Sequence, residues 1–233
     1  MEDLSKLEET IGCTFKNKDL LKQALVHRSY INEHKHFELG HNERLEFLGD
    51  AVLELVVTDH LYLNYELPEG ELTNLRAAVV RGEMLSRVAN ELGMSDFLLL
   101  SRGEQKGGEK ARNYIMANAF EALIGAIYLD LGYEAAKEFI DKFIVTKLPE
   151  VVEHGLHIDS KSKFQEVAQE KFKATPSYRV LDEDGLDHEK QFVIGVFVGK
   201  EKMGEGAGSS KQEAQQEAAK QALQKVQDTI DDD

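Results

Sequence analysis

The stretch HNERLEFLGDAVLELVV, His41 to Val57, places four carboxylates inside what otherwise reads as a buried apolar helix. At about 100° per residue, the four carboxylates share an arc of roughly 80°, and a set of apolar residues lies opposite. The carboxylates are Glu43, Glu46, Asp50 and Glu54, and the apolar residues are Leu45, Leu48, Val52, Leu55 and Val56. The pattern predicts one long helix with a core face and an acidic face.

An acidic helix face is commonly just a solvated surface, and that interpretation stays open. Two features favour a metal site instead. Phe47 and Ala51 flank the acidic face, and no lysine follows any of the acids at i+4 to pair with it. Unpaired carboxylates beside apolar residues raise one another's pKa unless a cation lies between them, and oxygen-rich clusters suit Mg²⁺ or Mn²⁺. The stretch therefore predicts a site for a hard divalent cation.

A second stretch, ARNYIMANAFEALIGAIYLDLG from Ala111 to Gly132, carries polar groups on an otherwise apolar helix. Asn118 and Glu121 are three residues apart and therefore share one face. A buried, unpaired carboxylate is costly, so Glu121 needs a partner. A metal ion shared with Glu46 and Asp50 would supply one.

Residues 1–153 show helical periodicity almost throughout, with glycine or proline at the breaks. The predicted helices are Leu4 to Ile11, Lys18 to Val26, Asn42 to Tyr65, Glu71 to Leu92, Lys110 to Leu131 and Tyr133 to Val152. HRSY, His27 to Tyr30, is typical of a helix end with a capping serine. A histidine metal site at His34, His36 and His41 is not favoured, because the spacing fits no common zinc pattern.

The helical pattern stops near residue 153, and residues 154–158 are predicted to form a linker. Residues 159–228 predict a helix, three strands and a helix, and residues 229–233 an acidic tail. The expected fold class is therefore an all-α N-terminal domain plus a small α+β (α-β-β-β-α) C-terminal domain.

Composition constrains the partners. The net charge is −15, and acidic residues outnumber basic ones on both sides of residue 153, so any contact with nucleic acid must be local. A single cysteine, Cys13, excludes an internal disulfide and fits a reducing compartment. No segment approaches 18 consecutive apolar residues, and the acidic start does not resemble a secretory signal. We therefore expect a soluble, cytoplasmic protein with no membrane partner.

NERLEFLGD, Asn42 to Asp50, resembles the signature of bacterial ribonuclease III. The resemblance implies a homodimeric endoribonuclease that cuts double-stranded RNA with Mg²⁺, for which Mn²⁺ can substitute, in the processing of rRNA and mRNA precursors. It implies that Glu46, Asp50, Asn118 and Glu121 hold the metal, with Asp50 and Glu121 catalytic. Glu43 and Glu69 would support the site and position RNA. The matching position usually carries aspartate where this chain has Asn118.

Three segments of the C-terminal part, KFQEVAQEKFKATPSY, GLDHEKQF and GEGAGSSKQEAQQEAAKQAL, resemble a double-stranded RNA-binding domain. Such domains recognise the A-form shape through 2′-hydroxyls and phosphates across two minor grooves. The resemblance implies that Gln165, Glu166 and His188 contact the minor grooves, and that Lys211 faces phosphates at a helix N-terminus.

Two alternatives remain at this point. A non-cleaving double-stranded RNA-binding protein is one, because Asn118 replaces the expected aspartate. A helical, metal-dependent phosphohydrolase of small substrates is the other, although such an enzyme has no use for the C-terminal domain. The apolar residues of LEFLGDAVLELVV are compatible with a dimer interface and equally with a monomer core.

Overall fold

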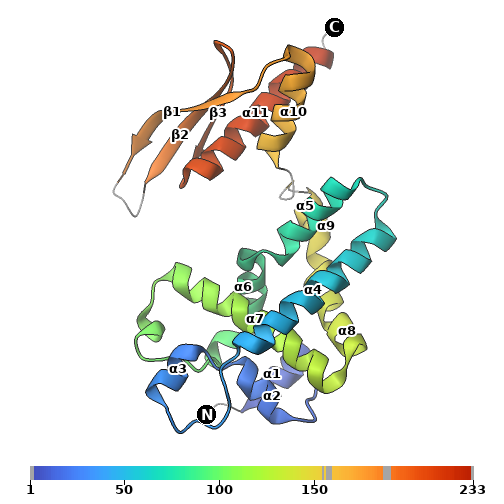
Figure 1. The fold of residues 1–233 in the computed structure, drawn as a ribbon, viewed down its shortest axis with the longest axis vertical. Helices are drawn as coiled ribbons and strands as arrows, with labels where there is room; N and C mark the ends of the chain where they lie inside the picture. The colour runs from blue at the N-terminus through green and yellow to red at the C-terminus, as the bar shows by residue number, and fades with distance from the viewer. Residues whose placement is uncertain (1–2, 154, 156–158, 186–189, 232–233) are drawn as a thin grey trace. The chain divides into compact units, whose positions relative to one another are not determined.

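The computed structural model describes residues 3–153, 155, 159–185 and 190–231, with side chains as far as residue 226. The chain forms two compact units, Met1–His157 and Ile158–Asp233. The first unit is helical (Figure 1). Its helices are α1 (Leu4–Ile11), α2 (Lys18–Ala24), α3 (Arg28–Glu33), α4 (Glu43–Asn64), α5 (Glu69–Val80), α6 (Gly82–Glu91), α7 (Glu109–Leu131), α8 (Tyr133–Phe143) and α9 (Leu148–Glu153), with 3₁₀ turns η1 (Met94–Asp96), η2 (Glu104–Lys106) and η3 (Val145–Lys147).

Helix α7 is the centre of the first unit. It packs against α2, α4, α6 and α8, and its residues from Ile115 to Ile127 are almost all buried. Among the described helices it alone is long and apolar enough to cross a membrane, but 61% of its apolar window is buried inside this unit. Burial against four neighbouring helices explains its composition, since a helix that is apolar all round belongs in a core.

Several predicted helices differ from the observed ones. The predicted helix Glu71 to Leu92 is two helices, because Arg81 is extended with ψ 147°. The predicted helix Tyr133 to Val152 is interrupted at η3, since the ring of Pro149 clashes with a helical carbonyl four residues earlier. HRSY begins helix α3 and does not end α2, and the side chain that caps α3 is His27.

The second unit contains α10 (Ser160–Phe172), strands β1 (Ser177–Asp184), β2 (Gln191–Val198) and β3 (Glu201–Gly208), and α11 (Lys211–Asp231). The strands form an antiparallel sheet in the order β1-β2-β3, and α10 and α11 lie side by side over it (Figure 1). The predicted all-α plus α+β fold class is confirmed. Helix α11 runs past residue 228, so part of the predicted acidic tail is helical.

Small residues let α11 lie close to β3. A Cβ atom on Gly206 would lie 2.2 Å from the backbone nitrogen of Ala218, and one on Gly204 would lie 2.4 Å from its carbonyl oxygen. Ala214, Ala218 and Ala222 of the helix are fully buried. The alternate glycines of GEGAG and the alanines of α11 therefore form one backbone-to-backbone contact, which orients the N-terminus of α11 relative to the sheet.

Candidate active site and RNA-binding surface

Helices α4 and α7 cross at two glycines. A Cβ atom on Gly49 would lie 1.7 Å from the carbonyl oxygen of Glu121, and one on Gly125 would lie 2.2 Å from that of Leu45. Both distances are impossible for a real side chain, so only glycine permits this crossing. The contact fixes Glu46 and Asp50 of α4 beside Glu121 of α7, although the two stretches are about 70 residues apart in sequence.

The carboxylates at this crossing act on one another. The pKa of Glu121 is raised to about 7, first by burial and then by the charges of Asp50 and Glu46. Burial also raises the pKa of Glu46, as do Glu43 and Asp50, while a hydrogen bond from the Asn118 side chain lowers it. The structure therefore brings Glu46, Asp50, Asn118 and Glu121 together, and the charges acting on the two glutamates are all negative.

The remaining acids lie outside this group. Glu43 begins α4 and contacts Arg28 and His41, with 3.7 Å between the nearest atoms of each pair. Glu69 begins α5, is exposed, and accepts a hydrogen bond from Thr73. Glu54 is exposed, and nothing in the structure assigns it a role. Leu55, which the helical pattern placed in the core, is 57% exposed, so the apolar face of α4 is narrower than predicted.

The donor types at the crossing fit a hard cation, since three carboxylates and an amide oxygen are ligands that Mg²⁺ accepts. Among the described residues, no three His, Cys, Asp or Glu side chains already converge closely enough to hold an ion. The carboxylates would therefore have to rotate toward one another. In the histidine-rich stretch, His34 stacks on the Tyr30 ring, and its Nδ1 atom is hydrogen-bonded to the Tyr30 carbonyl oxygen.

The helical pattern groups the acids but does not show how the two helices meet. The periodicity of each helix identifies Glu46, Asp50 and Glu121 as polar residues on apolar helices. It does not show that Gly49 and Gly125 make the contact between those helices. The only signal in the sequence was a glycine inside each of two long helical patterns, where glycine costs about 1 kcal/mol relative to alanine and so calls for a packing reason.

In the second unit, Gln165 and Glu166 are exposed on α10, and Lys211 is exposed at the start of α11. The N-terminus of α11 is capped reciprocally. Ser210 accepts from the Glu213 amide, and the Glu213 carboxylate accepts from the Ser209 amide. His188 lies outside the described residues.

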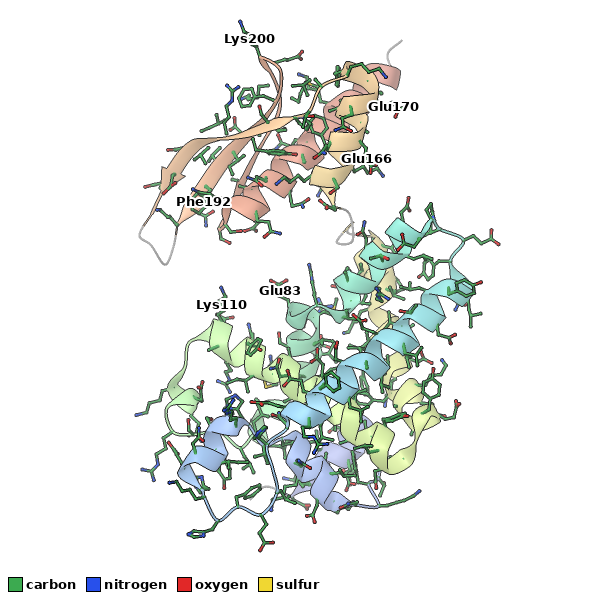
Figure 2. The ribbon with its side chains drawn as sticks, viewed as in Figure 1. Glu83, Lys110, Glu166, Glu170, Phe192 and Lys200 are labelled. Atoms are coloured by element: carbon green, nitrogen blue, oxygen red, sulfur yellow. The ribbon has the colours of Figure 1, made fainter. Side chains whose placement is uncertain are left out.

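Two lysines lie at the end of the sheet that adjoins the start of α11, where Lys190 is ion-paired with Glu183. The Nζ atom of Lys211 is 5.4 Å from the ring centre of Phe192, and that of Lys190 is 6.0 Å from it. Phe192 pairs with Gly208 at one end of the sheet, whereas Lys200 lies in the turn at the other end (Figure 2). Lys211 places a positive charge at a helix N-terminus, which is a favourable arrangement for phosphate.

Comparison with known proteins agrees with both units. A sequence profile of ribonuclease-III-like proteins matches residues 17–148, and one of the double-stranded RNA binding motif matches residues 160–226. A protein named Ribonuclease 3 from Oceanobacillus iheyensis is 45% identical, over 96% of this chain and 98% of its own length. Another of that name from Enterococcus faecalis is 43% identical, over 95% and 96%. The chain belongs to the ribonuclease III family.

Solved structures of this family resemble the first unit. The nuclease domain of ribonuclease III from Campylobacter jejuni is 41% identical with a TM-score of 0.57, and the match covers 63% of this chain and 99% of that one. That structure is described as having flexibility in a region involved in dimer formation. A second structure of the same nuclease domain matches with the same identity and TM-score.

Proposed function

We propose that this ribonuclease III family member cuts double-stranded RNA at the crossing of α4 and α7, in a reaction that depends on a divalent cation. The chain is an endoribonuclease of double-stranded RNA, as its match to Ribonuclease 3 proteins over nearly its whole length indicates. The metal, the residues that hold it and the assembly of the enzyme are our proposals.

The observation that supports the site is the raised pKa of Glu121 beside Asp50 and Glu46. Three carboxylates held together without a cation repel one another, and a bound divalent ion would offset that electrostatic repulsion. Glu46, Asp50, Asn118 and Glu121 would hold Mg²⁺, for which Mn²⁺ can substitute. Bound there, the ion would activate water and stabilise the charge that develops on the phosphate. Asp50 and Glu121 are the proposed catalytic residues.

The remaining proposed site residues orient the RNA. In the first unit, Glu43 and Glu69 hold RNA or solvent near the reacting phosphate. In the second unit, Gln165, Glu166 and His188 contact the minor grooves, and Lys211 contacts phosphates. The exposure of Gln165, Glu166 and Lys211 and the helix N-terminus at Lys211 support this assignment, because shape recognition of duplex RNA relies on scattered polar contacts.

The enzyme is proposed to be a homodimer. Phe47, Ala51, Leu55 and Tyr62 follow one another along α4 at spacings of four, four and seven, which makes one exposed stripe. Phe47 is 80% exposed, Leu55 57% and Tyr62 76%, and exposed apolar stripes of this kind mark interfaces. An apolar groove of about 470 Å³, lined by Tyr62, Leu67 and Leu72 among others, adjoins one end of the stripe. Two copies would present two sites to the two RNA strands.

Cleavage of a long RNA duplex in Mg²⁺, in Mn²⁺ and in EDTA tests the proposal. We expect cutting with either ion and none in EDTA. Glu121→Gln should lower the cleavage rate by about 100-fold or more, because it removes a carboxylate that acts at the reacting centre. Cutting that survives Glu121→Gln unchanged would show that the site is wrong. Glu83→Gln is a suitable control, since this side chain is 85% exposed at the start of α6.

The non-cleaving alternative is not favoured, because the chain keeps Glu46, Asp50 and Glu121 and matches proteins named as ribonucleases over nearly its full length. Binding without cutting under both ions, with cutting restored by Asn118→Asp, would revive it. We further propose that rRNA and mRNA precursors are the substrates and that the enzyme acts in the cytoplasm. Mapping the RNA ends that accumulate on depletion of the protein tests the first of these.

A further inference from the structure

At the start of α4, Glu43 is joined to two residues outside the proposed active site, Arg28 and His41. The Glu43 carboxylate lies between the guanidinium of Arg28 and the imidazole of His41. Its Oε1 atom is 3.7 Å from Nη1 of Arg28, and its Oε2 atom is 3.7 Å from Nδ1 of His41. Glu43 is one turn before Glu46, and its charge is one cause of the raised pKa of Glu46. A contact that fixes the Glu43 carboxylate therefore also changes the electrostatic environment of Glu46 at the crossing of α4 and α7.

The backbone around this cluster is fixed. Asn42, between His41 and Glu43, is 2% exposed. Its amide donates to the Val26 carbonyl oxygen at 2.9 Å, and its side chain donates to that of Ala24 at 3.1 Å. These bonds tie the entrance of α4 to the chain just before Arg28, which is the first residue of α3. The backbone that carries Arg28 and the backbone that carries His41 and Glu43 are therefore held together by the hydrogen bonds of Asn42.

His41 has an unsatisfied group directed at this carboxylate. Its Nδ1 atom is buried and has no hydrogen-bond partner among the described residues. A separation of 3.7 Å is too long for a hydrogen bond, but a shift of well under 1 Å would make a charge-assisted one. Besides Glu46, the titratable groups His27 and Glu104 lie near this cluster. Burial, the first cause, and the charge of His41 lower the pKa of His27, whereas Glu104 and Glu43 act in the opposite direction.

We propose that Arg28 and His41 are positioning residues that hold the Glu43 carboxylate at the edge of the acidic site. The inference rests on the proposed function, because Glu43 matters to catalysis only if the α4 and α7 crossing is the active site. Held between two donors, Glu43 keeps one orientation, and part of its negative charge is compensated. The Glu43 carboxylate then repels Glu46 less strongly, and it presents a fixed polar group to the RNA backbone.

A double-mutant cycle on the full-length protein tests the inference. Cleavage of a short RNA hairpin in Mg²⁺ is resolved into kcat and KM for Arg28→Gln, His41→Gln, Glu43→Gln and the two double variants that contain Glu43→Gln. We expect each single substitution to lower kcat roughly 3- to 10-fold, and we expect the Arg28 and His41 effects to disappear once Glu43 is Gln. His41→Asn, which keeps a donor close to the position of Nδ1, should recover most of the His41→Gln loss.

The readouts distinguish the possible failures. Arg28 and Glu43 side chains are 66% and 48% exposed, so the variants should fold, and thermal unfolding checks this. Effects that multiply fully in the double variants, or that fall only on KM, would overturn the inference, because Arg28 or His41 would then act on RNA directly. Glu121→Gln is measured alongside. If it is inactive while the cycle shows no coupling, only this inference fails, whereas full activity of Glu121→Gln removes the proposed site itself.

Discussion

Gly49 of α4 and Gly125 of α7 meet backbone to backbone, so that a Cβ atom on Gly125 would lie 3.2 Å from the Gly49 nitrogen and 2.2 Å from the Leu45 carbonyl oxygen. This contact sets the distance between the two acidic helices. Separating them by even one methyl group would move Glu121 away from Asp50 and Glu46.

Gly49→Ala should therefore destabilise the protein by about 3 kcal/mol, since an added methyl in a packed contact forces a backbone shift. It should also reduce cleavage. Urea unfolding measures the stability change. Gly70→Ala is the matched control, because nothing lies within 4 Å of a Cβ there, and alanine in helix α5 should leave stability unchanged or slightly raised. Equal effects of the two substitutions would contradict the close crossing.

Stability of the ion-free protein should fall as pH rises from about 5 to 8. The folded-state pKa of Glu121 is raised from 4.5 to about 7, so between these values the unfolded chain has lost a proton that the folded chain retains. Unfolding thus becomes easier across this window. Glu121→Gln removes the effect, and its Tm advantage over the parent in EDTA should grow from pH 5 to pH 8. An advantage independent of pH would argue against a raised pKa.

Asn118→Asp exchanges a hydrogen-bond donor to Glu46 for a fourth negative charge. In EDTA at pH 8 we expect a loss of about 1–2 kcal/mol of unfolding free energy, the scale of a hydrogen bond to a charged group. Saturating Mg²⁺ should recover most of it, because a cation would then lie among the carboxylates. Asn118→Ala, which loses only the donor, should not show that recovery. Thermal unfolding with and without Mg²⁺ separates the two variants.

Phe47→Ser should weaken self-association. Removing a phenylalanine side chain from an interface costs about 2 kcal/mol, which corresponds to a roughly 30-fold higher dimer Kd. Light scattering over a range of concentrations measures this. Leu129→Ser is the control, since Leu129 is 53% exposed on α7 and lies outside the α4 stripe. A parent protein that stays monomeric at high concentration would refute the dimer.

Lys211→Gln should weaken binding of duplex RNA and lower the slope of log K against log salt by about 1, as expected for one lost phosphate contact. Lys200→Gln is the matched control, because it removes the same charge at the opposite end of the sheet (Figure 2). Identical salt slopes for the two variants would show that charge at the start of α11 has no special role.

The sequence alone determined much of this protein. Helical and strand periodicity predicted the two fold classes, and the alternation of apolar and acidic residues identified the acids of α4 and the pair Asn118 and Glu121. These features are local, because the helical period of 3.6 residues and the strand period of 2 can be recognised within a short stretch of sequence. Helix ends were less accurate where a single residue decided them, as at Arg81, whose extended backbone divides one predicted helix into two.

Only the tertiary structure decided which of these groups meet. Glu46 and Glu121 are 75 positions apart in the sequence. No local pattern encodes the glycine contact that brings them close enough for their charges to interact. The exposure of Leu55 and Phe47 and the placement of Glu43 between Arg28 and His41 likewise depend on where neighbouring elements lie. Burial and charge interactions are properties of the packed chain, so the raised pKa of Glu121 exists only after folding.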